Sequence, residues 1–285
     1  MQQIHLAFKA FDIHEMLCHA IAEASGLYVD AGLSVTLVDA TFLPDEALPE
    51  NTFHTTCAAA MTSFLAGRPR KIVFVACDRP MFWLYGRAGI TSLKQLSQAR
   101  VATFPDVAPP SFFLRQFFTA ANIAPGLLPA RDDNARLALL TSASVDGALL
   151  SSLHLPHEVT ARGLHQLAFI GESLRLPSTG LAVDSELYED NPDLVASMAK
   201  LFQQSMQYIY DADDSVLRAV LVNTFGMSAN GLDTSIQTVR DCYNPLGYSC
   251  YSLLQRAIED MAAATGLTAR APEDLYEFKY LIPDN

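Results

Sequence analysis

The stretch "SGLYVDAGLSVTLVD" at residues 25–39 decides the fold, because it joins the end of a helix to a turn and a strand. Gly26 and Gly32 supply the left-handed backbone positions at which a chain turns back after a helix. The run at 33–39 alternates and is rich in β-branched residues, which predicts a strand. A helix that leads through a glycine turn into a strand is half of a βαβ unit.

The first strand of that unit lies upstream. The segment "IHLAFKAF" at 4–11 alternates apolar and polar residues with the period of a strand. It is followed by "DIHEMLCHAIAEASG" at 12–26, which has helical apolar spacing. Asp12 is the predicted N-cap, and Glu15 follows at the capping-box spacing. The N-terminal region therefore predicts a parallel, doubly wound unit.

The same alternation continues along the chain, which predicts α/β architecture with mainly parallel sheets flanked by helices. Further strands are expected at 71–78, 100–104, 145–151, 163–173 and 179–188, and further helices at 55–69, 90–100, 109–122 and 132–141. From residue 192 the pattern becomes mostly helical. The expected C-terminal helices cover 192–210, 213–224, 231–242 and 249–265.

Two apolar, near-extended stretches interrupted by proline or glycine suit crossings between domains, at 77–89 and 172–183. Two crossovers imply that a continuous middle domain is inserted into a domain built from both ends of the chain. We therefore expect a two-lobed protein. The first lobe comprises 1–87 and 179–285, and the second comprises 88–178.

The charge balance excludes several classes of partner. The chain has 19 Lys and Arg against 31 Asp and Glu, a formal net charge of −12. This excess of acids repels phosphate backbones and anionic lipid headgroups, so we expect no nucleic-acid binding and no membrane insertion. Apolar runs also stay shorter than the roughly 18 residues that a spanning helix needs.

The N-terminus and the cysteines bear on the compartment. Lys9, Asp12, His14 and Glu15 stand where a secretory signal would place its apolar region. The five cysteines are odd in number and form no C-x-x-C pair, which favours reduced thiols. We expect a cytoplasmic protein, or a periplasmic one if a leader has been removed.

Five stretches, taken in order, resemble the type II periplasmic solute-binding proteins for nitrate, sulfonate, taurine and thiamine-pyrimidine precursors. They are "AEASGLYVDAGLSVTLVD" (22–39), "AGRPRKIVFVA" (66–76), "ITSLKQLSQARVAT" (90–103), "LLTSASVDGALLSS" (139–152) and "LPSTGLAVDSELYEDNPDLVASMAKLFQQSMQYI" (176–209). The resemblance covers roughly residues 3–210. It implies a small-molecule binding protein that closes two lobes over its ligand and serves a membrane component of an ABC transporter.

Some features of that family are different here. The signal peptide or lipid-anchoring cysteine of a transport receptor does not appear. The pyrimidine-synthase branch has a cysteine cluster near the return strand and a sacrificial histidine in its third helix. Here these places read "LPSTGLA" (176–182) and "TTCAAAMTS" (55–63), so that chemistry is not transferred.

The resemblance implies a ligand at the loops that follow the carboxyl ends of the strands, between the lobes. The candidate ligand-binding residues in those loops are Phe11, Asp12, His14, Thr55, Thr56, Cys57, Asp78, Arg79, Phe104, Ser111, Ser151, Ser178 and Thr179.

Several of the polar candidates have an alternative role. Thr55 and Thr56 either present hydroxyls and backbone N–H groups to an anion or simply cap a helix. Arg79 either clamps an anionic group or pairs with Asp78 at a hinge. Asp12 and His14 suit a helix cap and a surface histidine as well as ligand contacts.

Aromatic residues near these loops indicate the kind of ligand. Phe11, Phe53, Phe82, Trp83 and Phe104 fall at or near predicted cleft loops. The loop before Ser111 contains Pro109 and Pro110, which lack the N–H donors of an anion-binding turn. An aromatic or heterocyclic ligand with one anionic or polar group fits these features better than nitrate or a bare alkyl sulfonate.

The alternative to a binding protein is a cytoplasmic enzyme on the same scaffold, of the decarboxylase, dehydratase or C–S lyase type. Cys57 at a helix N-terminus, three residues after His54, is the candidate nucleophile, because thiol pKa values fall at such positions. A buried helix cysteine is the alternative reading. The residue patterns predict no cofactor and no metal site.

Overall fold

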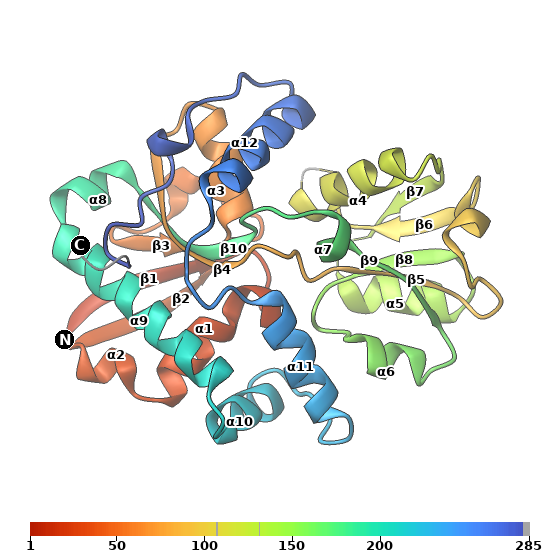
Figure 1. Ribbon diagram of the computed structural model, residues 1–285, viewed down its shortest axis with the longest axis horizontal. Helices are drawn as coiled ribbons and strands as arrows, with labels where there is room; N and C mark the ends of the chain where they lie inside the picture. The colour runs from red at the N-terminus through yellow and green to blue at the C-terminus, as the bar shows by residue number, and fades with distance from the viewer. Residues whose placement is uncertain (107, 131, 282–285) are drawn as a thin grey trace. The chain divides into compact units, whose positions relative to one another are not determined.

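The computed structural model describes residues 1–106, 108–130 and 132–281 (Figure 1). The chain divides into two compact units. The first comprises Met1–Asp78, Leu176–Ala229 and Ile236–Asn285, and the second comprises Arg79–Arg175 and Asn230–Ser235. Among the described helices, none combines the length and the apolar character needed to cross a membrane.

The first unit is built on a five-stranded mixed sheet. Its spatial order is β2 (Leu33–Asp39), β1 (Gln2–Phe8), β3 (Thr52–His54), β10 (Thr179–Asp184) and β4 (Arg70–Cys77). β1 pairs in parallel with β2 and β3, and β10 runs antiparallel to β3 and β4. The carboxyl ends of β1, β2, β3 and β4 therefore share one edge with the start of β10.

Helices cover both faces of this sheet (Figure 1). α1 (Ile13–Ala24) packs with α9 (Pro192–Tyr210) on one face, and α3 (Cys57–Leu65) packs with α12 (Tyr251–Thr265) on the other. The unit also holds α2 (Leu27–Asp30), α8 (Ser185–Asp190), α10 (Ser215–Asn223) and most of α11 (Leu232–Cys242). Short 3₁₀ turns lie at Asp45–Ala47 and Pro272–Asp274.

The second unit has its own five-stranded sheet, flanked by α4, α5, α6 and α7. The strand order is β7 (Gly126–Pro129), β6 (Arg100–Thr103), β8 (Gly147–Leu150), β5 (Trp83–Gly86) and β9 (His165–Phe169). β5 runs antiparallel to β8 and β9, and the other pairs are parallel. The helices are α4 (Pro109–Ala120), α5 (Asp133–Thr141), α6 (Pro156–Thr160) and α7 (Ile170–Ser173), with a 3₁₀ turn at Leu93–Leu96.

The free edge of β4 is covered by two segments from the C-terminal part of the chain. Ile72 N donates to Leu275 O at 2.7 Å, and Glu277 N donates to Ile72 O at 3.0 Å. Further along the strand, Val75 N donates to Gly247 O at 2.7 Å. These bonds satisfy backbone groups that an edge strand would leave exposed.

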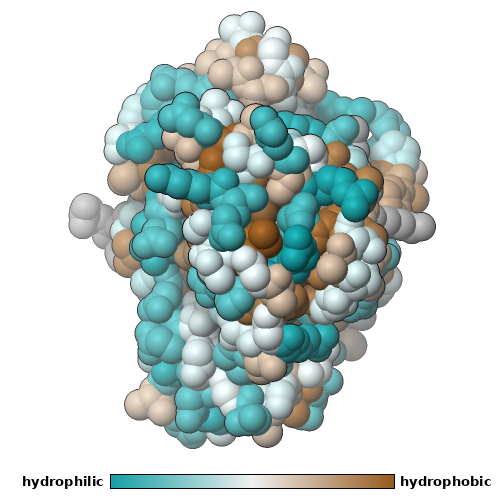
Figure 2. All heavy atoms as spheres, turned by 90° about the vertical axis from the view of Figure 1, so that its right-hand side faces the viewer, coloured by the Kyte–Doolittle hydropathy of each residue, from teal (hydrophilic) through white to brown (hydrophobic). Residues whose placement is uncertain are grey.

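The hydrophobic core of each unit lies between its sheet and its helices. β4 and β5 are buried along almost their whole length. On the face drawn in Figure 2, hydrophilic residues prevail, and hydrophobic residues appear in small spots among them.

The α/β class with two mainly parallel, helix-flanked sheets is confirmed, as is the βαβ start with Asp12 as the N-cap of α1. The prediction missed β3, β5 and β7, each of four residues or fewer. The units change over at 78–79 and 175–176, where the sequence suggested 87–88 and 178–179. The first difference arises because β5, inside the expected crossing, joins the second sheet.

A glycine in β10 is required by close packing. A Cβ at Gly180 would lie 2.0 Å from Phe74 O, a backbone atom that cannot move aside. We expect Gly180→Ala to lower the free energy of unfolding by about 3 kcal/mol. Gly67→Ala is the control, because Gly67 has φ +94° but open space around it, and backbone strain alone costs about 1–2 kcal/mol. Urea denaturation measures the free energy of unfolding of both variants. An equal decrease for Gly180→Ala and Gly67→Ala would contradict the packing explanation.

Candidate functional site

The shared edge of the first sheet brings together sequence-distant candidate residues. Asp12 and His14 follow β1, Thr55 and Thr56 follow β3, Asp78 follows β4, and Ser178 and Thr179 begin β10. Most of them are buried; Thr56 and Asp78 are half-buried. These seven candidate residues therefore lie along one edge of the first sheet.

The centre of this edge is the buried carboxylate of Glu15. Its Oε1 accepts hydrogen bonds from Lys9 N at 2.7 Å, from Thr55 Oγ1 at 2.5 Å and from Thr56 Oγ1 at 2.6 Å. Its Oε2 accepts one from Ala10 N at 2.8 Å. Burial raises the pKa of Glu15, and the four donors oppose that rise in part.

The hydroxyls of Thr55 and Thr56 thus do meet an anionic oxygen, but it belongs to the chain itself. Neither side chain caps α3, whose N-cap Thr56 makes no side-chain capping bond. Thr55 Oγ1 also lies 3.1 Å from Ala7 O. Asp12 is a helix cap, since its side chain accepts from Glu15 N at 3.0 Å.

His14 and Ser178 form a buried hydrogen-bonded pair rather than a surface site. Ser178 Oγ donates to Cys77 O at 2.9 Å, and His14 Nε2 lies 2.8 Å from Ser178 Oγ. Because the single hydroxyl proton points to Cys77 O, Nε2 of His14 is the donor in this second bond. Thr179 Oγ1 donates to His14 O at 2.7 Å, which fixes the first turn of α1 to β10.

Cys57 and His54 do not form a nucleophile and base. Cys57 is fully buried, and its Sγ lies 3.6 Å from Phe74 O. Burial raises the pKa of the thiol, which is the opposite of the expected activation. Nε2 of His54 contacts Arg70 instead, and burial and that cation lower its pKa to about 3.

The carboxyl edge of the second sheet holds a different arrangement. Arg136, only 1% exposed, contacts Asp133, donates Nε to Leu149 O at 2.9 Å, and lies over the Phe104 ring at 3.5 Å. Asp133 in turn accepts from Ser151 N at 3.1 Å and from the Ser151 hydroxyl. Ser151 therefore has a structural role, as the buried hydrogen-bond partner of Asp133.

Two buried hydroxyls at the same edge lack a hydrogen-bond partner among the described residues. They belong to Thr103, the last residue of β6, and to Ser111 in the first turn of α4. An unpaired buried hydroxyl costs roughly 1–3 kcal/mol. Such groups are rare in folded proteins, and each calls for a physical explanation.

The aromatic candidates divide by exposure. Phe53 and Trp83 are core residues, and Trp83 stacks on Phe169 with ring centroids 5.0 Å apart. Phe82 is buried and Phe104 is half-buried. Phe11 differs from them, because 38% of its surface is exposed.

The remaining candidates lie near the segments that join the two units. Arg79 is half-buried and opens the second unit, directly after Asp78. In the first unit, Leu176 N donates to Asp78 O at 3.0 Å and Ser178 N donates to Cys77 O at 2.9 Å. The outgoing and returning segments are thus bonded side by side.

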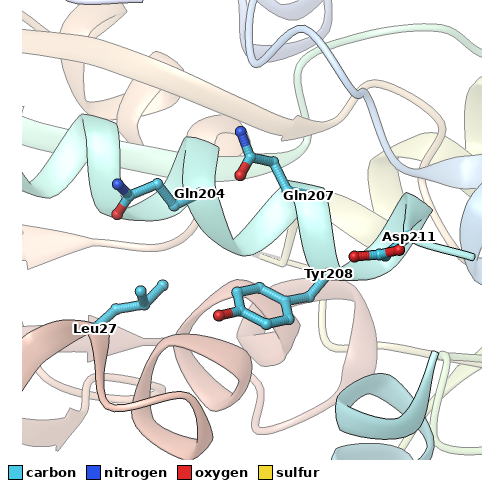
Figure 3. A pocket seen from close by; sticks show the side chains of 5 residues that line it. All are labelled: Leu27, Gln204, Gln207, Tyr208 and Asp211. Atoms are coloured by element: carbon cyan, nitrogen blue, oxygen red, sulfur yellow. The ribbon is translucent and has the colours of Figure 1, made fainter. Parts of the chain in front are cut away.

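A surface pocket of the first unit lies away from these residues. It is lined by Leu27, Gln204, Gln207, Tyr208 and Asp211 (Figure 3). Leu27 follows the C-terminal end of α1, so the pocket lies at the opposite end of that helix from Asp12. Among the described residues, no His, Cys, Asp and Glu group is arranged to hold a metal ion.

Solved structures share this fold at low sequence identity. No known family model matches the sequence, and no curated protein matches it. The aliphatic sulphonate-binding protein SsuA of Escherichia coli aligns over 100% of this chain and 95% of its own, with 14% identity and a TM-score of 0.74. The ligand-binding component of an ABC-type import system from Staphylococcus aureus aligns over 99% and 98%, with the same identity and TM-score.

An enzyme also has this fold. The desulfurization enzyme DSZB, crystallised as a mutant with biphenyl-2-sulfinic acid, aligns over 98% of this chain and 97% of its own. Its identity is 14% and its TM-score is 0.72. A Candida albicans protein described as exhibiting the generic periplasmic binding protein structural fold aligns over 100% of this chain and 99% of its own, with 12% identity and a TM-score of 0.73. The fold implied by the sequence motifs is therefore confirmed.

Sequence reasoning missed several residues at these edges. Glu15 stood out only through its capping-box spacing, and its side chain makes other bonds. Asp133 and Arg136 are three residues apart on α5, a spacing common to exposed helix pairs, and were not among the predicted site residues. Phe225, which contacts Phe11 at 5.9 Å between ring centroids, lies beyond the region of motif resemblance.

Glu15→Gln tests the network at the first edge. The amide retains one acceptor oxygen but replaces the other with an NH2 group, which would face groups that are themselves hydrogen-bond donors. We therefore expect the free energy of unfolding to fall by about 3 kcal/mol. Glu23→Gln, exposed on the same helix, is expected to change stability by less than about 0.5 kcal/mol. Chemical denaturation compares them. Similar values for both variants would show that the network contributes little.

The buried histidines predict acid sensitivity. Burial lowers the pKa of His14 to about 3 and that of His19 to about 4, below the ordinary 6.5. Below pH 6.5 the unfolded chain binds protons that the folded chain does not, so stability falls as the pH drops toward these values. The slope approaches about 1.4 kcal/mol per pH unit for each histidine.

The variant His14→Gln isolates one of these contributions. Loss of the hydrogen bond to Ser178 changes the stability of this variant at every pH. The informative quantity is therefore the slope of the free energy of unfolding against pH. Urea unfolding between pH 4.5 and 8 should show a shallower decline than in the wild-type protein, by one histidine's share. Parallel curves for the two proteins would refute the assignment.

Proposed function

We propose that the protein binds a small molecule and serves as a receptor, in the manner of the substrate-binding components that share its fold. The observation that supports this most is the pair of buried, unpartnered hydroxyls of Thr103 and Ser111 at the carboxyl edge of the second sheet. In open α/β sheets, that edge is where ligands bind. A ligand with an acceptor oxygen would supply the missing hydrogen bonds.

The ligand that fits is a small aromatic or heterocyclic molecule with an anionic or polar group. The polar group suits Ser111, Arg79 and the positive end of α4, a helix of twelve residues. Phe11, in the first unit, is the most exposed of the aromatic candidates. The comparisons support the anionic group of the proposed ligand, because SsuA proteins of this fold are named for binding sulfonates.

Membership in an import system is part of this proposal. One protein of the same fold is named as the ligand-binding component of an ABC-type import system. Another is named under a sulfonate ABC transporter as its periplasmic sulfonate-binding protein SsuA. By analogy, the partner would be the membrane component of an ABC transporter and the location would be the periplasm.

The enzyme alternative rests on DSZB, which shares the fold. An enzyme that uses the Cys57 thiol as its nucleophile is less well supported in this chain, because Cys57 is buried and burial raises the pKa of its thiol. His14 is likewise buried and hydrogen-bonded to Ser178. A receptor role requires no activated group and agrees better with these contacts.

Identification of the natural ligand is the direct test. Native mass spectrometry of the purified protein, followed by release of any bound molecule, is expected to show one small aromatic or heterocyclic acid. Turnover of that molecule during incubation would favour the enzyme instead. A ligand that lacks both a ring and a polar group would overturn the proposed class.

Arg79→Ala tests the anionic contact with benzoate and benzenesulfonate as probes. We expect affinity to weaken by about 1.5–3 kcal/mol, the range for a charged hydrogen bond. Arg87→Ala is the control, because Arg87 follows the far end of β5 and pairs with Asp146 at 3.0 Å. Calorimetric titration and thermal melts are measured together. A lower melting temperature with unchanged affinity would make Arg79 a structural partner of Asp78.

A further inference from the structure

We propose that Phe225 is a specificity-determining residue, which with Phe11 and Phe8 forms, within the first unit, an aromatic platform for a ligand ring. This inference rests on the proposed receptor function and adds to it a contact from the C-terminal part of the chain. The three side chains come from the end of β1, the loop after it and the segment after α10.

The Phe11 ring contacts each of the other two rings within the first unit. The Phe11 and Phe225 rings have centroids 5.9 Å apart and planes tilted by 36°. Phe8 meets Phe11 edge to face, at 5.6 Å and 75°. Phe8 and Phe225 are half-buried, and Phe11 is exposed over more than a third of its surface. The cluster thus supports its outermost ring from two sides.

The backbone on both sides of the cluster is held in place. Glu15 accepts hydrogen bonds from Lys9 N and Ala10 N, directly before Phe11. Beyond α10, Gly226 adopts a φ of +67° and donates to Val222 O at 3.1 Å. The next residue, Met227, donates to Leu221 O at 3.0 Å, and its side chain is buried. Both loops therefore present their rings in a defined position.

The chemistry of such a platform favours a flat ring over a saturated one. Aromatic pairs in offset or tilted contact are stabilised beyond the area that they bury, through the quadrupoles of the two rings. A saturated ring of similar size buries comparable apolar area but lacks that contribution. The position after β1 is also the strand end at which the fold binds ligands.

The experiment compares matched probes. Benzenesulfonate is paired with cyclohexanesulfonate, and benzoate with cyclohexanecarboxylate, so that each pair differs only in the ring. By calorimetric titration, the wild-type protein is expected to bind the aromatic member about threefold to tenfold more tightly. Phe225→Leu should reduce that preference to less than twofold while it still binds the saturated member. Phe225→Tyr should retain the preference.

Phe117→Leu is the matched control, because Phe117 is half-buried on α4 and contacts Phe118 at 5.9 Å. It should lose some stability and keep the wild-type preference. Thermal melts of every variant separate folding from binding. If Phe225→Leu does not fold, the same comparison is made with Phe11→Leu, whose ring is the most exposed of the three.

The outcomes separate this inference from the receptor proposal. Equal affinity for both members of each pair, or a preference that survives Phe225→Leu and Phe11→Leu, would overturn the platform and leave the receptor standing. If none of the four anions binds, benzamide is tested as a neutral aromatic probe. Binding of benzamide that depends on Phe225 would support the platform and count against the anionic group. Failure of benzamide as well would overturn both.

Discussion

The buried charge of Glu15 organises the first unit. A carboxylate removed from water must regain its lost hydration from the chain, and here four donors from two separate loops supply it. One atom group therefore fixes the loop after β1 and the loop after β3 relative to each other. Neither loop is able to shift without leaving a buried charge unpaired, so the backbone before Phe11 and before α3 is set by electrostatics.

The hydroxyl groups at the carboxyl edges of the two sheets differ in their hydrogen bonding. In the first, the hydroxyls of Thr55, Ser178 and Thr179 are all used within the chain. In the second, the charged pair Arg136–Asp133 is satisfied, but two neighbouring hydroxyls are not. The first edge is thus a rigid scaffold. The second has unused hydrogen-bonding capacity, and the receptor proposal depends mainly on it.

The fold could be predicted from the sequence because its signals are local. Glycine turns, an Asp N-cap and alternation of strand and helix patterns are each contained within about fifteen residues. The short strands β3, β5 and β7 were missed because three or four residues do not establish a period, and their pairing comes from neighbours far along the chain. β5 also follows a proline-containing segment that reads as a linker.

The candidate site could be predicted only in outline. The loops after β1 and β4 follow from the expected strands, whereas Thr55 and Thr56 were placed only by the expected start of α3. The partner of each side chain could not be predicted, because Thr55 meets Glu15 across 40 residues and His14 meets Ser178 across 164. Residue type shows that Ser and Thr can bind a ligand. Only the structure shows that most of them already bind the chain.

The C-terminal segments that hydrogen-bond to the edge of β4 matter during synthesis and proteolysis of the chain. The edge of β4 is protected by residues 244–247 and 275–277, which are synthesised long after β4 itself. Until they emerge from the ribosome, the nascent chain displays an open row of peptide groups that would pair with any extended strand nearby. Cleavage near residue 270 would release residues 275–277 but not 244–247, so it would expose the peptide groups of Ile72 and favour their pairing with another extended strand.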